Sequence, residues 1–401
     1  MFDLTSLAGI LGKTLGILYL SSVLWLLPLL VYAFWKLWVD YVRWESIAKR
    51  EYILLEIKLP KEIRKSPKAM EVVLNAISQT GGEGNWFAKY WKGGTRPWFS
   101  LEMNSIEGQV RFIIWAQKSF KRMIESQIYA EYPEVEIYEV EDYMKDVFYN
   151  PEINSLWGGE FILTKADPYP IKTYTDYDLK ASDKEEEKVD PISTMVEYLG
   201  SLGEGERAYI QILTRAHKEE EGAHDNLKEQ AKKEIEKILS EGKLKGKGEK
   251  DTPAAASLTK NQQDAIGAIE RSLGKPAYDV GIRGIYFAEK DKFNTMGGPG
   301  LINAFKQYNS VNLNGFKPTN TTSFDYPWQD YKNIRLNKKK KYILDAYKRR
   351  SYFHPPYKRK HFVLNSDELA TIYHFPGRVT GTPTFVRIAS KKAEAPSNLP
   401  I

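Results

Sequence analysis

The longest uncharged stretch of the chain lies near its N-terminus, between Lys13 and Lys36. A helix over residues 14–35 would be about 33 Å long at about 1.5 Å per residue, which is close to the hydrocarbon thickness of a bilayer. Leucine, isoleucine and valine supply most of its apolar surface. The sequence therefore predicts a transmembrane helix over residues 14–35.

Aromatic side chains gather toward the C-terminal end of this run, where indole and phenol rings prefer the headgroup level of a membrane. A proline within the run could kink the span, which a bilayer helix tolerates. The residues that we predict to form the membrane anchor are Trp25, Pro28, Trp35, Lys36 and Trp38.

The flanking charges predict the orientation of the span. Lys36, Arg43, Lys49 and Arg50 follow the run, whereas only Lys13 precedes it. Because cytoplasmic flanks carry an excess of Lys and Arg, the C-terminal region is expected in the cytoplasm. We therefore predict a single-pass protein of the cytoplasmic (inner) membrane, in which residues 1–13 lie on the extracytoplasmic side.

Two other interpretations of the apolar run are weaker. A secretory signal peptide would be shorter, would begin with more positive charge than a segment containing Asp3, and would end at a small-x-small cleavage site. A hairpin of two short helices over residues 4–39 would need a turn signal within the run. Residues 9–14 end like a phosphate-binding P-loop, but the first glycine that this motif requires would fall at Leu7.

Composition predicts a folded but non-catalytic soluble region. The 401 residues are 42% hydrophobic and 27% charged, which is typical of globular proteins. The chain has no cysteine, which excludes disulfides, thiolate metal sites and a cysteine nucleophile. Its five histidines lack the spacing of a zinc helix, and there is no G-x-S-x-G element. We therefore expect no enzymatic activity, no cofactor and no metal.

After a basic, aromatic juxtamembrane helix over residues 36–50, alternating apolar residues predict a first domain over residues 51–145. Its elements follow the order β-α-β-β-α-β, which is the ferredoxin-like signature. The strands are expected at 51–59, 98–103, 109–115 and 134–140, with a hairpin turn at 104–108, a helix opened by Ser66-Pro67 and a helix at 118–130.

A similar order recurs over residues 155–317, which predicts a second ferredoxin-like unit split by a charged helical insertion at 218–250. That insertion is expected to be either a solvated face or a partner-docking arm. The fold class predicted is thus a membrane-anchored α+β protein with one N-terminal transmembrane helix and two ferredoxin-like units. The other elements are expected as strands at 160–165, 207–215 and 280–288 and helices at 191–202, 260–273 and 300–308.

A basic and aromatic C-terminal segment is expected over residues 318–401. Its cations cluster between Lys332 and Lys360, where Asp345 is the single acid. Such a segment can neutralise phosphates while its rings stack on bases, it can bind anionic lipid or an acidic partner, or it can be solvated while its rings pack inward. The candidate binding residues are Lys338, Lys339, Lys340, Lys341, Tyr342, Lys348, Arg349, Arg350, Tyr352, Lys358, Arg359 and Lys360.

The stretches at 341–357, 363–377 and 391–400 resemble the region upstream of the motor domain in membrane-anchored ATPases of the conjugative-coupling and HerA/FtsK-like superfamily, of the type found in bacteria of the candidate phyla radiation. The segment Trp86–Trp98 and the first β-α-β-β-α-β block look similar to the N-terminal part of the same proteins. In those relatives a Walker A loop and the ATPase core follow; this sequence ends at Ile401. A truncated longer product would give the same pattern.

The resemblance implies an accessory component of a DNA-transfer or type IV secretion-like machine. Its expected partners are the lipid bilayer, a separate P-loop ATPase, DNA and further copies of itself. The alternative is an envelope scaffold that binds proteins or anionic lipid without DNA.

The apolar run generates the first testable prediction. After cell lysis and high-speed centrifugation, the full chain should be found in the membrane pellet and should require detergent for extraction, because about 33 Å of apolar helix cannot stay in water. Washing with high salt or alkali should not release it. Recovery of the full chain in the supernatant without detergent would contradict the transmembrane assignment.

Overall fold

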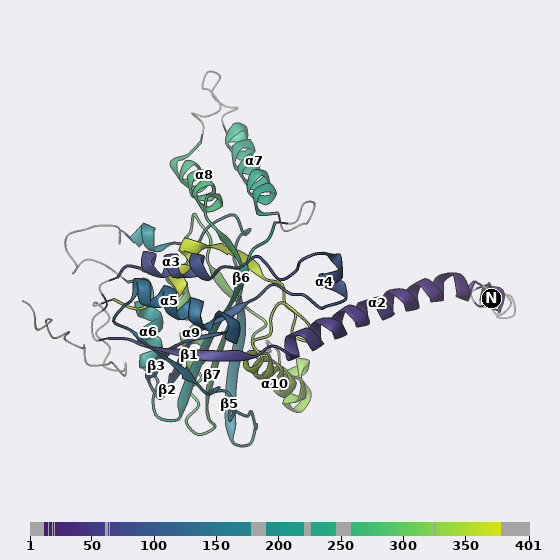
Figure 1. Cartoon of the computed structure of the whole chain (residues 1–401), viewed down its shortest axis with the longest axis horizontal. Coiled ribbons are helices and arrows are strands. Elements are labelled where there is room, and N and C mark those ends of the chain that lie inside the picture. Colours follow the sequence, from purple (N-terminus) through teal and green to yellow (C-terminus); the bar gives the residue numbers. More distant parts are fainter. Residues whose placement is uncertain are drawn as a thin grey trace, which may run out of the picture. The chain divides into compact units, whose positions relative to one another are not determined.

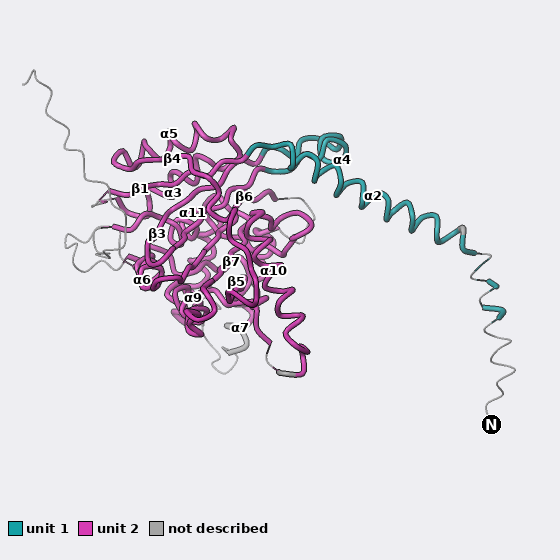
Figure 2. Tube along the Cα trace, turned by 90° about the horizontal axis from the view of Figure 1, so that it is seen from below, with its two compact units in different colours: residues 1–51, 81–96 teal, residues 52–80, 97–401 magenta. Residues whose placement is uncertain are grey.

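The computed structural model describes residues 12–14, 16–17, 19, 21–60, 63, 65–177, 190–219, 226–245, 258–324 and 326–377. The chain divides into two compact units, shown in different colours in Figure 2. The first comprises residues 1–51 and 81–96, and the second comprises residues 52–80 and 97–401.

The described part of the first unit includes the long helix α2 (Ser22–Ala48) and the short helix α4 (Trp86–Tyr90). Helix α2 joins residues 22–35 of the predicted span to the predicted juxtamembrane helix without a break, because no residue around Trp35 and Lys36 breaks a helix. The N-terminal part of the predicted span differs, since Ser21 is a turn residue and residues 15, 18 and 20 lie outside the described residues. Pro28 lies inside α2. Among the described residues, one helix is long and apolar enough to cross a membrane, at Leu24–Ala48. Its length, composition and N-terminal position are consistent with a single-pass anchor or a signal sequence.

The second unit is built on one antiparallel sheet of nine strands, which confirms the α+β class (Figure 1). Eight strands lie in the order β4-β1-β3-β2-β6-β7-β5-β8, and β9 pairs with β7. The strands are β1 (Tyr52–Lys58), β2 (Phe99–Ile106), β3 (Gln109–Gln117), β4 (Glu136–Val140), β5 (Asn154–Leu163), β6 (Glu206–Ala216), β7 (Ala277–Glu289), β8 (Phe316–Thr319) and β9 (Phe362–Asn365).

Helices connect these strands and cover the sheet. The α-helices are α3 (Pro67–Ile77), α5 (Lys121–Glu131), α6 (Ser193–Gly200), α7 (Leu227–Lys245), α8 (Lys260–Leu273), α9 (Gly297–Lys306), α10 (Ile334–Lys348) and α11 (Ser366–Ile372). Short 3-10 helices are η1 (Lys118–Phe120), η2 (Tyr174–Tyr177), η6 (Pro327–Gln329) and η7 (Tyr331–Asn333).

The N-terminal half of the sheet has the element order that the sequence predicts. Strand β1, helix α3, strands β2 and β3, helix α5 and strand β4 follow one another, and the strands lie in the order β4-β1-β3-β2. The predicted hairpin turn at 104–108 was too long. Strand β2 continues to Ile106, and the turn consists of Glu107 and Gly108, both with positive φ, as a tight two-residue hairpin requires.

The C-terminal half repeats this order with an insertion. Strand β5, helix α6, strands β6 and β7, helix α9 and strand β8 follow one another, and the strands lie in the order β6-β7-β5-β8. Helices α7 and α8 are inserted between β6 and β7 and pack against each other as an arm (Figure 1). Ala231 and Ile238 of α7 are buried with Ala265 and Ile269 of α8, so α7 has an apolar face rather than a fully solvated one. Residues 220–225 and 246–250 of the predicted insertion lie outside the described residues.

The two halves share one sheet because β6 pairs with the whole length of β2, from Phe99 opposite Thr214 to Ile106 opposite Arg207. One face of the sheet carries the main apolar core with α3, α5, α6, α9 and α11. Strand β9 and α11 join this unit, so part of the predicted C-terminal segment completes the sheet.

Candidate nucleic-acid interface

Helix α10 carries half of the predicted binding residues and packs on the face of the sheet opposite the main core. Ile343, Leu344 and Tyr347 of α10 are buried with Leu156 of β5 and with side chains of β6 and β7. Successive strand residues point to opposite faces, which separates this smaller apolar cluster from the main one. One side of α10 is therefore fixed, and its opposite side faces solvent.

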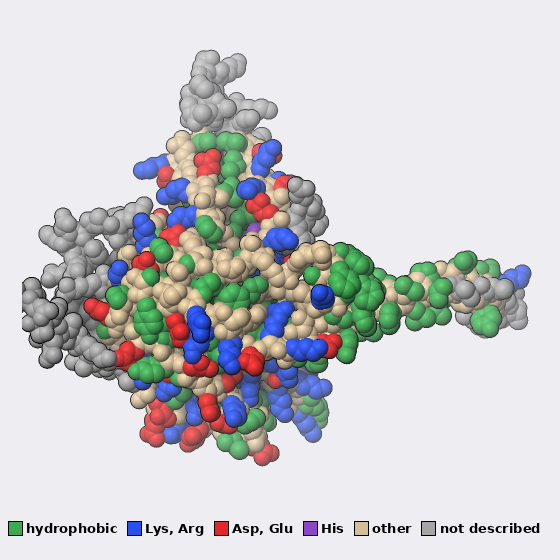
Figure 3. All heavy atoms as spheres, viewed as in Figure 1, with side chains coloured by type: hydrophobic (Ala, Val, Ile, Leu, Met, Phe, Trp, Pro, Cys, Tyr) green, Lys and Arg blue, Asp and Glu red, His purple; other side chains and the backbone are tan. Residues whose placement is uncertain are grey.

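The structure separates the predicted binding residues into three groups. Lys338, Lys341, Arg349, Lys358 and Lys360 are exposed, and Tyr342 is 37% exposed. In Figure 3, Lys and Arg side chains gather over α10. The half-buried residues are Lys339, Lys340, Lys348 and Arg359, and the buried ones are Arg350 and Tyr352.

The half-buried lysines hold α10 against the loop that precedes β5. Lys348 Nζ donates to the carbonyl of Val147 at 3.1 Å and lies 4.4 Å from the ring centre of Phe148. Lys340 Nζ lies 5.6 Å from the ring centre of Tyr149, and burial lowers its pKa. These two lysines thus contribute contacts within the fold as well as positive charge.

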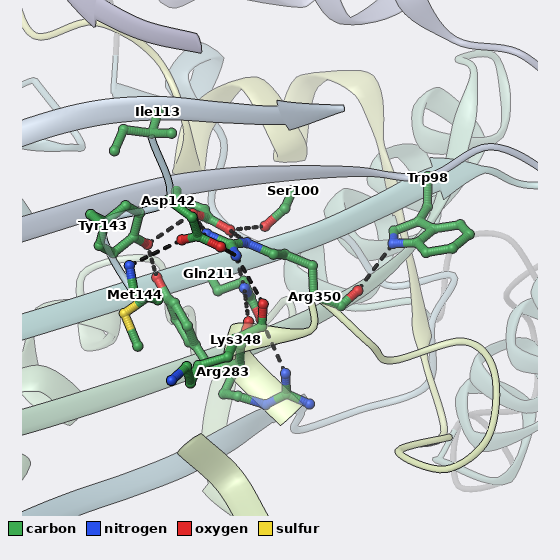
Figure 4. Close-up of polar contacts among 12 residues, drawn as sticks. Trp98, Ser100, Ile113, Asp142, Tyr143, Met144, Gln211, Arg283, Lys348 and Arg350 are labelled. Carbon is green, nitrogen blue, oxygen red and sulfur yellow. Dashed lines mark hydrogen bonds and ion pairs between the residues drawn. The ribbon is translucent and has the colours of Figure 1, made fainter. Parts of the chain in front are cut away.

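Arg350 is buried and not exposed to solvent, which corrects that part of the prediction. Its side chain is 2% exposed and forms ion pairs with Glu102 on β2, at 3.1 Å, and with Asp142. Figure 4 shows Asp142 beside the Arg350 side chain. Burial disfavours the charged guanidinium, but the two carboxylates outweigh this effect and raise its pKa well above the usual value. The indole N–H of Trp98 donates to the Arg350 carbonyl at 3.0 Å. Arg350 therefore fixes the C-terminal end of α10.

Glu102 belongs to a row of buried polar residues that crosses four neighbouring strands. Glu102 of β2 lies opposite Gln211 of β6, which lies opposite Arg283 of β7, which lies opposite Glu160 of β5. Neighbouring side chains are joined at 3.0–3.1 Å: Gln211 donates to Glu102, and Arg283 donates to Gln211 and to Glu160. This polar row runs beneath α10 and includes the central β2–β6 pair.

Two tyrosines connect the polar row to α10. The hydroxyl of Tyr143 donates to Glu102 at 2.8 Å and lies 2.8 Å from the hydroxyl of Tyr347. Burial raises the pKa of both tyrosines well above the usual value, so both stay neutral. The partners of these side chains are thus other residues of the chain, which is the arrangement expected of a structural network.

Tyr352 is also unavailable for stacking on a base. Its ring is 2% exposed and packs on β7, where a Cβ at Gly281 would lie 2.4 Å from the ring. Its hydroxyl donates to the carbonyl of Lys360 at 3.1 Å. The Tyr352 ring therefore stabilises the loop that follows α10. The exposed Lys360 lies on that loop.

Exposed rings lie instead just before α10, at positions that the sequence analysis did not select. Tyr326, Trp328 and Tyr331 are 52%, 78% and 75% exposed. The rings of Tyr326 and Trp328 stack, with centres 4.7 Å apart. The Asp330 carboxylate accepts the backbone N–H groups of Arg335 and Leu336 in the first turn of α10, so this aromatic segment is fixed to the helix. Its signal in the sequence is a group of aromatic residues among polar ones.

A hollow of about 650 Å³ lies on another part of the second unit, beside α3 and α8. Lys275 Nζ lies 3.2 Å from Glu71 and also contacts Asp367, while the hydroxyl of Tyr174 donates to Glu71 at 2.8 Å. Burial raises the pKa of Asp367. The lysine is thus shared by two carboxylates and joins segments distant in sequence. Among the described residues there is no group of three or more His, Asp or Glu that could hold a metal ion.

The chain belongs to a protein family described as a domain of unknown function (DUF8128), which matches residues 44–387. The search of curated proteins finds no match. The family match includes the whole sheet, α10 and the polar row. The family therefore supports a common fold for this region and names no activity.

The Arg350 ion pairs generate the second prediction. Arg350→Ala should lower the free energy of unfolding by about 3–5 kcal/mol, because it leaves Glu102 buried without its cation. Denaturant unfolding of the full chain in detergent, followed by tryptophan fluorescence, measures the effect.

Arg349→Ala is the matched control. Arg349 is the preceding residue, is exposed, and pairs with Asp345 at 2.9 Å on the same helix. Its removal should change the free energy of unfolding by less than about 1 kcal/mol. Equal effects of the two substitutions would show that the buried ion pairs do not hold α10 in place.

Proposed function

We propose that this chain is a non-catalytic, membrane-anchored component of a DNA-transfer or type IV secretion-like machine, acting with a separate P-loop ATPase. The observation that supports it most is the combination on α10 of exposed cations, a rigid buried face and the adjacent exposed rings. The resemblance of residues 341–377 to the pre-motor region of coupling ATPases points to the same class.

The chemistry of this surface suits a polyanion. Lys338 and Lys341 lie one helical turn apart on the solvent side of α10, and Lys358 and Lys360 add two more exposed cations. Cations that neutralise phosphates release bound counterions, which gives salt-dependent affinity without sequence preference. Trp328 and Tyr331 provide the ring surfaces on which unpaired bases stack. The proposed ligand is therefore DNA with single-stranded character.

The remaining parts of the proposal concern architecture. We infer that each half of the sheet is a ferredoxin-like unit, since each has the order β-α-β-β-α-β and mirrored strand orders that meet at the β2–β6 pair. In the proposed topology, α2 spans the cytoplasmic membrane with the N-terminus outside, and the sheet lies in the cytoplasm. Further copies of the chain would assemble through the sheet-bearing unit.

An envelope scaffold that binds anionic lipid or protein is the second candidate. The same exposed cations favour it, at about 1 kcal/mol for each basic residue near an anionic membrane surface. Flotation of the protein with anionic liposomes in the presence of competing DNA separates the two candidates. If DNA displaces the protein from the liposomes, the result supports the first candidate. If the protein stays bound to the liposomes at every DNA concentration, the result supports the scaffold.

The third prediction concerns the lysines. The double variant Lys338→Gln, Lys341→Gln should weaken DNA binding and reduce the slope of log affinity against log salt by about 0.9 for each duplex phosphate that is no longer neutralised. Filter binding of the full chain in detergent across a salt series measures both quantities.

The control is Lys228→Gln, Lys233→Gln on α7, where the two lysines are 68% and 70% exposed. This variant has the same net charge as the test variant. An equal decrease in affinity for both would mean that total charge, and not the α10 surface, determines binding.

The fourth prediction concerns the exposed indole. Trp328→Ala should weaken binding to single-stranded DNA by about 1–3 kcal/mol, the usual value of one stacked base, and should affect duplex binding much less. Tyr138→Ala on β4 removes another exposed ring and should leave both affinities unchanged. Equal decreases for single-stranded and duplex DNA would contradict base stacking at Trp328.

A further inference from the structure

The loop over residues 81–96, here called the aromatic loop, is built onto helix α2 within the first unit. Gly93 has φ +65°, and a Cβ there would lie 2.3 Å from the carbonyl oxygen of Val42. Only glycine permits so close an approach with this backbone conformation. Arg96 lies 3.4 Å from Glu83, which joins the two ends of the loop. The loop is therefore a fixed part of the helical unit.

This loop presents large rings to solvent. Its short helix α4 begins after Asn85, whose side chain accepts the N–H of Ala88 at 2.9 Å, and none of the residues of α4 is buried. Trp86, Phe87 and Trp91 are 60%, 52% and 45% exposed. Exposed rings in one preformed loop are a costly surface in water, and such patches mark sites of interaction.

The rings of the aromatic loop pack against α2 around Trp35 and Trp38. Trp35 lies within 5.9–6.4 Å, between ring centres, of Trp86, Tyr90 and Trp91, and Trp38 lies 5.6 Å from Trp91. This part of α2 is at the C-terminal end of the span that the sequence predicts over residues 14–35, and it lies within the apolar stretch Leu24–Ala48 of α2. Indole rings prefer this depth, at the boundary between acyl chains and headgroups.

The surface around these rings is continuous with that of the span. Leu30, Phe34 and Leu37 of α2 are 54%, 66% and 69% exposed, and hydrophobic side chains run together over α2 and α4 in Figure 3. Lys89 and Lys92 flank the rings of the loop, with their amines within 5.8 Å of the ring centres of Tyr90 and Phe87. Rings with adjacent long cationic side chains suit a membrane surface, where the amines reach the phosphates.

We propose that the aromatic loop is a second membrane contact, which inserts Trp86, Phe87 and Trp91 at the headgroup level of the bilayer that α2 crosses. This inference rests on the proposed anchoring of α2. The loop adds lateral contact area to a single helix and fixes the depth of α2 at Trp35 and Trp38. Its occupant is lipid, and Lys89 and Lys92 favour anionic headgroups.

Because the sequence has no cysteine, single introduced cysteines can be labelled selectively. The variant Phe87→Cys is labelled with an environment-sensitive fluorophore, and the full chain is reconstituted into vesicles of phosphatidylcholine and phosphatidylglycerol. Nitroxide lipids carrying the spin label at the headgroup or deep in the acyl chain then quench the fluorophore. Trp86→Cys is labelled as an independent second position, in case one substitution disturbs the loop.

Two further positions serve as references. Leu27→Cys reports the span itself, and Lys237→Cys, at a lysine that is 65% exposed on α7, reports the sheet-bearing unit. Labels at positions 86 and 87 should be quenched at least twofold more by the headgroup nitroxide than by the deep one. The label at position 27 should show the reverse order, and the label at position 237 should be quenched by neither.

The possible results distinguish failure of the loop contact from failure of the proposed α2 span. Quenching at position 27 without quenching at 86 or 87 would overturn the aromatic loop as a membrane contact and leave the span intact. No quenching at any position would overturn both. If labels at 86 and 87 stay unquenched while the Phe87→Cys variant readily forms a disulfide between two chains, this face belongs to a second copy and the proposal is also overturned.

Discussion

The buried charges beneath α10 are the constraint on which the second unit depends. The buried Arg283, Arg350, Glu102 and Glu160 pair among themselves and with the partly exposed Arg359 and Asp142, so cations and carboxylates in the cluster are equal in number. Removing such charges from water costs several kcal/mol each, and only a complete set of partners offsets the cost. Because the polar row crosses the β2–β6 pair, the same contacts that seat α10 also join the two halves of the sheet.

These contacts leave one side of α10 available for the binding role that we propose. The apolar side of α10 and the arginine at its C-terminal end are used by the fold, which leaves Lys338 and Lys341 on a rigid, solvent-facing side. A charged surface held rigidly loses less conformational entropy on binding than a flexible tail would. The exposed rings of Trp328 and Tyr331 are fixed to the same helix through Asp330, so cations and stacking surfaces keep a constant geometry.

In the first unit, the surface that needs an explanation is apolar, and the proposed surroundings are lipid. The apolar exposure of α2 and the aromatic loop would be unfavourable in water and is favourable at a bilayer. Gly93 is as important here as any ring, because it lets the loop backbone reach α2. Taken together, the chain combines an apolar surface suited to a membrane with a cationic surface suited to a polyanion.

Local pattern in the sequence determined the apolar helix, the α+β class, the order of most strands and helices, and the position of the basic segment. These features reflect periodicity and solvation over a few residues, and so they can be read without knowing the fold. Tertiary structure decided which charges are exposed and which are buried. Arg349 and Arg350 are adjacent and chemically identical, yet one is exposed and the other is paired with Glu102 across 248 positions of sequence. Their difference arises from strand pairing and register, which bring distant charges together and leave no local signal.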